Sequence, residues 1–142
     1  MTNQEHRVKL PGSINQVREA CEFVAKIGRE VGLNDDGVYQ IQLSVEEIFT
    51  NIVEHGYKHN GANKSIELVC IIRGNLLEIS IIDEAPPFNP LELSDPDPEN
   101  IWERETGGWG VYFVRRFMDD IRYQLDPDNR NHLILEKRLS DG

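Results

Sequence analysis

The chain has few of the features that mark several common classes of protein. It has only two cysteines among 142 residues, which excludes a disulfide-rich secreted scaffold. No apolar run approaches the roughly 20 residues that a membrane-spanning helix needs. The start, MTNQEHRVKL, lacks the apolar stretch of a signal peptide. We therefore expect a cytoplasmic protein with no membrane partner, and we favour two buried thiols, Cys21 and Cys70, over a disulfide.

Positive charge is also scarce. The chain has 15 Lys and Arg against 25 Asp and Glu, for a formal net charge of -10. A general nucleic-acid binder needs a basic surface to neutralise phosphates, so direct binding to nucleic acid is not expected. A single nucleotide is not excluded by this charge, because it needs only local donors and a cation.

Three well-known catalytic motifs are missing. The sequence has no G-x-x-x-x-G-K-[ST] loop, and neither the V-A-I-K lysine nor the H-R-D loop of eukaryotic-type protein kinases. Glu54, His55 and His59 do not follow the H-E-x-x-H order of zinc hydrolases. Any phosphate chemistry must therefore use another framework.

The apolar pattern predicts a single domain over residues 1–142. Ser13 is a candidate N-cap for the first helix, Asn34 or Asp35 for the second, and Gly32 is a plausible stop between them. The expected elements, in chain order, are an edge strand ending at Pro11-Gly12, helices over 14–31 and about 35–56, strands over 65–73 and 76–83 joined at Gly74-Asn75, a proline-rich loop, a helix over 111–121, and strands over 122–125 and 132–139. This order predicts an α+β fold, a two-layer α/β sandwich in which about three helices cover one face of a mainly antiparallel mixed sheet.

The second helix carries an unusual polar stripe. At roughly 100° per residue, Glu47, Asn51 and His55 stack along one border of the apolar face. Glu46 falls roughly 140° of rotation away from Asn51. Glu47 and Asn51 can be ordinary boundary residues, or they can form one site with two hard oxygen donors that suit Mg²⁺ or a water beside a phosphoryl group.

Two further stretches could contact a nucleotide. Asp83 ends an apolar strand and precedes Pro86-Pro87, where a carboxylate could accept a hydrogen bond from the exocyclic amino group of adenine. It could also simply begin a turn. Gly107, Gly108 and Gly110 precede the third helix, and glycines at a helix N-terminus let phosphates approach the free backbone N–H groups.

Together these stretches resemble the motifs of the GHKL ATPases, in order and spacing. Those motifs are Glu47-x-x-x-Asn51, the stretch DEAPPF at 83–88, a proline-rich segment and GGWG at 107–110. More closely, nearly the whole chain resembles the bacterial anti-sigma factor serine/threonine-protein kinases, through HGY after Asn51, the glycine-rich helix start and the ending HLILEKRL.

The resemblance implies a Bergerat ATP-binding fold and a role for each matching residue. Glu47 would orient or activate the attacking hydroxyl, and Asn51 would ligate Mg²⁺. Asp83 would bind adenine, and residues 89–106 would form a lid over ATP. The other residues expected at the nucleotide are Ala85, Pro87, Gly107, Gly108, Gly110 and Val111.

Ala85 stands where the family usually has glycine. If the backbone there has φ > 0, alanine should cost roughly 1–2 kcal/mol. If φ is negative, the alanine is harmless.

The resemblance implies an ATP-dependent kinase that binds a sigma factor and phosphorylates an anti-anti-sigma antagonist, often as a homodimer. One alternative is a nucleotide-binding switch that sequesters a partner without phosphotransfer. Another is the detached ATP domain of a histidine kinase, but the chain has too few residues to add the phospho-acceptor helix pair.

Overall fold

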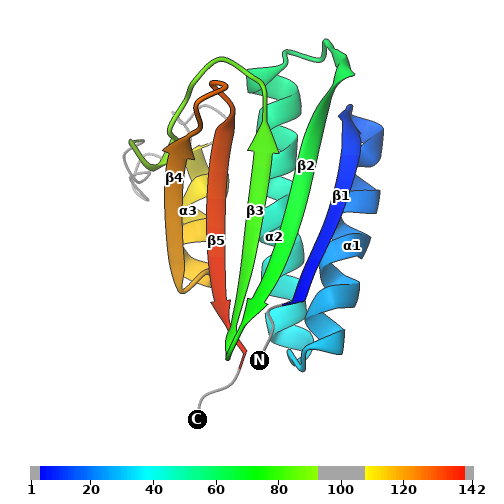
Figure 1. Cartoon of the computed structure of the whole chain (residues 1–142), viewed down its shortest axis with the longest axis vertical. Helices are drawn as coiled ribbons and strands as arrows, with labels where there is room; N and C mark the ends of the chain where they lie inside the picture. Colours follow the sequence, from blue (N-terminus) through cyan, green and yellow to red (C-terminus); the bar gives the residue numbers. More distant parts are fainter. Residues whose placement is uncertain (1–3, 93–107, 140–142) are drawn as a thin grey trace.

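The computed structural model describes residues 4–92 and 108–139, which form one sheet with helices on one side (Figure 1). Three α-helices contribute most of the helical layer. The elements are β1 (Gln4–Gly12), the 3-10 turn η1 (Ile14–Gln16), α1 (Val17–Glu30), α2 (Asp35–Asn51), the π-helical turn η2 (Ile52–Gly56), β2 (Gly61–Arg73), β3 (Leu76–Asp83), the 3-10 turn η3 (Pro90–Glu92), α3 (Gly108–Phe117), β4 (Asp120–Leu125) and β5 (Asn131–Arg138).

The five strands follow the order β1-β2-β3-β5-β4, and all four pairings between them are antiparallel. The helices α1, α2 and α3 lie behind this sheet on a single face (Figure 1). The predicted two-layer fold is therefore confirmed, and the described strands contain no parallel pair. The register between β3 and β5 places Asp83 directly opposite Asn131.

The core lies between the two layers. Helix α2 buries an apolar face of Val38, Ile41, Val45, Ile48 and Phe49. Alternate residues of β2 and β3 meet it, because successive side chains of a strand point to opposite faces. The buried strand residues are Ile66, Leu68, Cys70, Leu77, Ile79 and Ile81. Cys21 is only half-buried, and both cysteines are free.

Local chemistry explains where α1 ends and α2 begins. Gly32 has a φ of 99°, and the Leu33 N–H donates to the Gly28 carbonyl at 2.9 Å, which closes the end of α1. The Asn34 side chain then accepts from the Gly37 N–H at 2.8 Å, as an N-cap does. The prediction for Ser13 was wrong. Its side chain makes no capping bond, since the chain enters α1 through the turn η1.

Two other boundaries differ from the sequence pattern because strand pairing takes priority there. Helix α3 ends at Phe117, since Asp120 and Ile121 pair with β5. Strand β2 begins at Gly61 rather than at 65, because Gly61 pairs with Gly12 at the end of β1. Among residues 4–92 and 108–139, no helix is long and apolar enough to cross a membrane.

Candidate active site

The elements that carry the described candidate residues come together at one end of the molecule. The C-terminal end of α2, the end of β3 and the start of β5 lie together at the upper end in Figure 1, near the first turn of α3. Strand and helix directions produce this arrangement, because α2 and β3 run toward that end while α3 and β5 start from it.

Glu47 lies half-buried on α2, beside the start of α3. A Cβ atom at Gly110 would overlap Glu47 Oε2, so the carboxylate lies directly over the backbone of this glycine. A side chain at position 110 would therefore displace the Glu47 carboxylate. Asn51, also half-buried, follows one turn later on the same stripe of α2.

The surroundings of Glu47 raise the pKa of its carboxyl group. Burial is the largest cause, followed by the negative charges of Glu46 and Glu54. A carboxylate whose pKa is raised accepts a proton more readily, which suits a general base. Glu46 itself is exposed, so it influences Glu47 only through its charge.

We expect Glu46→Gln to leave phosphoryl transfer unchanged near neutral pH, and to move the acidic limb of the rate profile to lower pH. If Glu47 is the predicted general base, only its ionised form can accept a proton, so activity should fall as pH drops through the pKa of Glu47. Removing the Glu46 charge lowers that pKa. A pH–rate profile at saturating ATP measures the shift, with the exposed Glu19→Gln on α1 as the matched control. An acidic limb that does not move would contradict this electrostatic coupling.

Asp83 is a buried carboxylate with one oxygen engaged. Its side chain is 6% exposed. Its Oδ1 accepts from the Ala85 N–H at 2.8 Å and from Asn131 Nδ2 at 3.0 Å. Within the described residues no hydrogen bond reaches Oδ2, so this oxygen is available as an acceptor. Burial raises the pKa of Asp83, and the bonds from Asn131 and Ala85 oppose that rise.

Asn131 organises the loop that follows Asp83, and the sequence reasoning missed it. Its Nδ2 also donates to the Ala85 carbonyl at 3.0 Å, while its Oδ1 accepts from the Phe88 N–H at 3.1 Å and from the Tyr123 hydroxyl. A buried asparagine that uses both ends of its amide fixes the loop in one conformation. One sequence feature could have indicated this role: Asn131 is a polar residue at the first position of β5, where the alternating pattern of this strand begins.

Ala85 causes no backbone strain. The only described non-glycine residues with positive φ are Lys58, His59 and Asn129, so Ala85 does not occupy the left-handed region. Its methyl group is buried beside Gly56, where a Cβ would come within 2.9 Å of it. Alanine is therefore compatible with this loop, and glycine at 56 makes room for it.

The remaining predicted residues have different surroundings. Pro87 is exposed in the loop after Asp83, Gly108 is the first residue of α3, and Val111 is buried. Gly107 and residues 93–106 of the expected lid lie outside the described residues. The turn η3 lies in the described part of the expected lid, and Arg115 of α3 donates to its Leu91 carbonyl at 2.7 Å.

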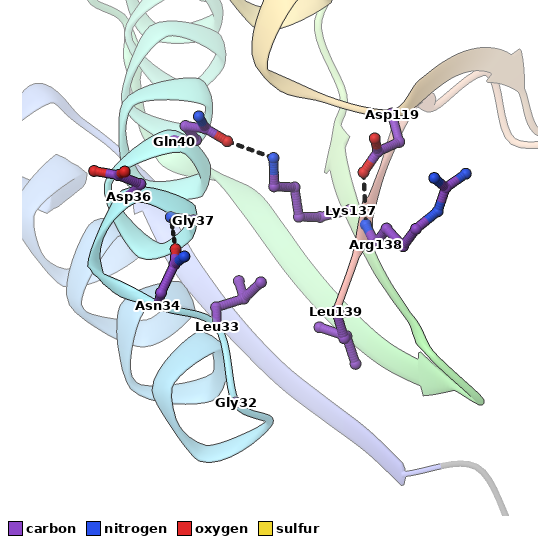
Figure 2. A pocket seen from close by; sticks show the side chains of 10 residues that line it. All are labelled: Gly32, Leu33, Asn34, Asp36, Gly37, Gln40, Asp119, Lys137, Arg138 and Leu139. Carbon is purple, nitrogen blue, oxygen red and sulfur yellow. Dashed lines mark hydrogen bonds between the residues drawn. The ribbon is translucent and has the colours of Figure 1, made fainter. Parts of the chain in front are cut away.

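A separate polar cavity lies at the opposite end of the sheet (Figure 2). It lies between the start of α2 and the end of β5, and its lining includes Asn34, Asp119 and Lys137. Lys137 Nζ is engaged by the Gln40 side chain and the Phe117 carbonyl. None of the residues predicted to bind a nucleotide lines this cavity, so it is distinct from the site built around Glu47 and Asp83.

The donors at the site suit a nucleotide with a hard cation. The described part of the chain has no group of three or more His, Cys, Asp or Glu side chains placed to hold a metal. Mg²⁺ typically takes one or two protein oxygens and completes its octahedron with phosphate oxygens and water. The Asn51 amide oxygen is such a donor, and Glu47 lies one turn away on the same face.

The two-layer fold and this arrangement of polar groups define the class of Bergerat-type ATPase domains. The model for the histidine kinase-like ATPase domain matches residues 10–137, and the chain belongs to this family. The fold predicted from the resemblance is therefore confirmed.

Comparison with characterised proteins gives the same grouping. The chain is 25% identical over 124 residues to the serine-protein kinase RsbW of Bacillus licheniformis, covering 82% of this chain and 77% of that protein. It is 28% identical over 106 residues to the anti-sigma F factor of Oceanobacillus iheyensis, covering 74% and 72% of the two chains. These names agree with the predicted resemblance.

Solved structures support the fold alone. The structure of the RsbU and RsbW domains of Rv1364c from Mycobacterium tuberculosis superposes with a TM-score of 0.66 at 18% identity, over 95% of this chain and 32% of that longer one. The catalytic domain of the histidine kinase ThkA superposes with a TM-score of 0.54 at 16% identity, over 100% of both chains.

Proposed function

We propose that this protein is an ATP-dependent serine/threonine kinase that also acts as an anti-sigma factor. The observation that carries the proposal is the stripe of Glu47 and Asn51 on α2, with Glu47 lying over Gly110 at the start of α3. The names of the relatives, serine-protein kinase RsbW and anti-sigma F factor, supply the substrate class and the partner class.

In the proposed reaction, a hydroxyl oxygen of the protein substrate attacks the γ-phosphorus of ATP. The bond between that phosphorus and the oxygen bridging to ADP breaks, and the hydroxyl proton passes to Glu47. The raised pKa of Glu47 favours its role as the acceptor. Positioning and charge neutralisation supply most of the acceleration in phosphoryl transfer.

Each end of the nucleotide would meet a different part of the site. Asn51 would hold Mg²⁺, which neutralises charge on the phosphates when bound. Backbone N–H groups in the first turn of α3, at Gly108 and Gly110, would face the phosphates. The free Oδ2 of Asp83 would accept a hydrogen bond from the adenine amino group, and Asn131 would keep that carboxylate in place.

Two protein partners belong to the proposal. The protein would bind a bacterial sigma factor and hold it inactive, and it would phosphorylate an anti-anti-sigma antagonist, so transcription would respond to the state of that antagonist. It would act in the cytoplasm, as a homodimer. Sedimentation of the purified protein with and without ADP tests the dimer.

The phosphorylated product distinguishes this proposal from its rivals. We expect purified protein with ATP and Mg²⁺ to transfer phosphate to the antagonist, and the product to be an acid-stable phosphoserine or phosphothreonine. Phosphosite mapping after acid treatment makes the measurement. An acid-labile phosphohistidine would indicate histidine-kinase chemistry instead. Nucleotide-dependent binding of a partner without any transfer would support the switch that only sequesters.

A further inference from the structure

Tyr57 links the end of the helix that carries Asn51 to the loop that carries Asp83. Its backbone N–H donates to the Ile52 carbonyl at 2.7 Å, which closes the π-helical turn η2 directly after Asn51. Single π-helical turns are rare and occur frequently at functional sites.

Close packing holds the Tyr57 ring in one place. The side chain is 4% exposed. A Cβ at Gly12 would come within 2.6 Å of the ring, and a Cβ at Gly61 would also overlap it. The ring therefore lies against the bare backbone where β1 ends and β2 begins. These two glycines pair with each other where the register between β1 and β2 shifts, and the ring packs on the backbone at this point.

The hydroxyl group of Tyr57 contacts the loop that follows Asp83. It donates to the Ser65 carbonyl at 2.7 Å and accepts from the Glu84 N–H at 2.8 Å. Burial raises the pKa of Tyr57 to about 12, so the hydroxyl stays protonated and keeps both bonds at any physiological pH. Glu84 directly follows Asp83, so this bond acts on the backbone next to the carboxylate.

The Asp83 loop is thus held from two sides. On the sheet side, Asn131 binds Asp83 Oδ1 and the Ala85 carbonyl. On the helix side, Tyr57 binds the Glu84 N–H, and the Ala85 methyl packs against Gly56. Because the Ala85 N–H is used by Asp83 itself, the two N–H groups that follow Asp83 both have partners. The direction in which Asp83 Oδ2 points follows from these bonds.

We propose that Tyr57 is a positioning residue for base recognition, whose hydroxyl holds the loop so that Asp83 can select adenine over guanine. The inference rests on the proposed function, in which Asp83 reads the base. Tyr57 does not itself touch the nucleotide. It acts through Glu84 and Asp83, and it ties the base-binding end of the site to the helix that carries the metal-binding Asn51.

Tyr57→Phe tests this inference, because it removes the hydroxyl oxygen and keeps the ring on Gly12 and Gly61. Losing a buried hydrogen bond of this kind should weaken ADP binding by about 10-fold. The preference for ADP over GDP should fall by a similar factor, since the Asp83 carboxylate loses its fixed direction. The rate of transfer at saturating ATP should stay within about 2-fold of wild type, because Glu47 and Asn51 are untouched.

Two control variants separate positioning from general destabilisation. Tyr39→Phe removes the same atom from a tyrosine that is 60% exposed, and it should leave both nucleotide affinities unchanged. Val24→Ala creates a cavity in α1, away from the site, and should lower the melting temperature without changing the preference for ADP over GDP. Calorimetric titration with ADP and GDP measures all four proteins.

The outcomes are distinct. A Tyr57→Phe variant that keeps the wild-type preference for ADP over GDP overturns the inference, even if its melting temperature falls. A wild-type protein that binds neither nucleotide overturns the proposed function and this inference with it. Amide exchange supplies an independent readout in the variant: the Glu84 N–H should exchange faster, and unchanged exchange there would also contradict the inference.

Discussion

Glu47→Gln should lower the rate of phosphoryl transfer at saturating ATP by about 10²–10⁴-fold, the usual contribution of a positioned general base. Glutamine keeps the shape of the side chain and its place over Gly110, but it cannot accept the hydroxyl proton. The Michaelis constant for ATP should change little, because the proposed role of Glu47 is to act on the attacking hydroxyl rather than on the nucleotide. Steady-state transfer to the antagonist, measured over a range of ATP concentrations, separates the two constants.

Glu46→Gln provides the matched control for that experiment. It makes the same chemical change at the adjacent position, on the opposite flank of α2, where the side chain is exposed. Near neutral pH it should transfer phosphate at the wild-type rate. Transfer by Glu47→Gln as fast as by wild type would show that Glu47 is not the base, and would leave its raised pKa without a catalytic role.

Asp83→Asn should reduce affinity for ATP and ADP on the order of 10²-fold, because a hydrogen bond to a charged, buried acceptor is lost. The asparagine Oδ1 can keep the bonds from Ala85 and Asn131. Its Nδ2 then stands where Asp83 has the acceptor Oδ2. An N–H donor would therefore face the amino group of adenine, which is itself a donor. We expect ADP to raise the melting temperature of wild type and to leave that of Asp83→Asn nearly unchanged.

The stability of the ligand-free variant provides the control. Burial raises the pKa of Asp83, so folding favours the protonated form, and stability declines as pH rises from the ordinary pKa of an aspartate to the raised pKa of Asp83 in the folded protein. Removing this carboxylate should therefore leave the ligand-free protein at least as stable as wild type at neutral pH. If GTP stabilises wild type as well as ATP does, or if Asp83→Asn keeps its response to ADP, the role of Asp83 in base recognition is wrong.

Much of the fold could be read from periodicity. Helical spacing predicted one apolar face for the second helix, made of seven residues. Ile52 is only partly buried, and the other six are buried: Val38, Ile41, Val45, Ile48, Phe49 and Val53. The Gly74-Asn75 hairpin and the end of α1 at Gly32 also follow from local backbone chemistry, with φ values of 59° at Gly74 and 99° at Gly32. Such features depend on residues a few positions apart, so a single sequence determines them.

The candidate site could be predicted only in part. The four-residue spacing of Glu47 and Asn51 placed both on one stripe of a helix, and the strand pattern placed Asp83 at the end of β3. The roles of Tyr57 and Asn131 were missed, since HGY entered only as part of the family resemblance and Asn131 was not singled out. Their roles depend on partners 27 and 48 positions away in the chain.

The sequence alone determined which residues share a helix face, where the strands turn, and which stretches could meet a nucleotide. Only the tertiary structure decided how those stretches are held. It showed that the Tyr57 hydroxyl accepts a hydrogen bond from the Glu84 N–H, that Asn131 of β5 bonds to the loop after Asp83, and that Ala85 fits without a positive φ. The physical reason is that buried backbone and amide groups must find hydrogen-bond partners, and chain folding rather than chain order supplies those partners.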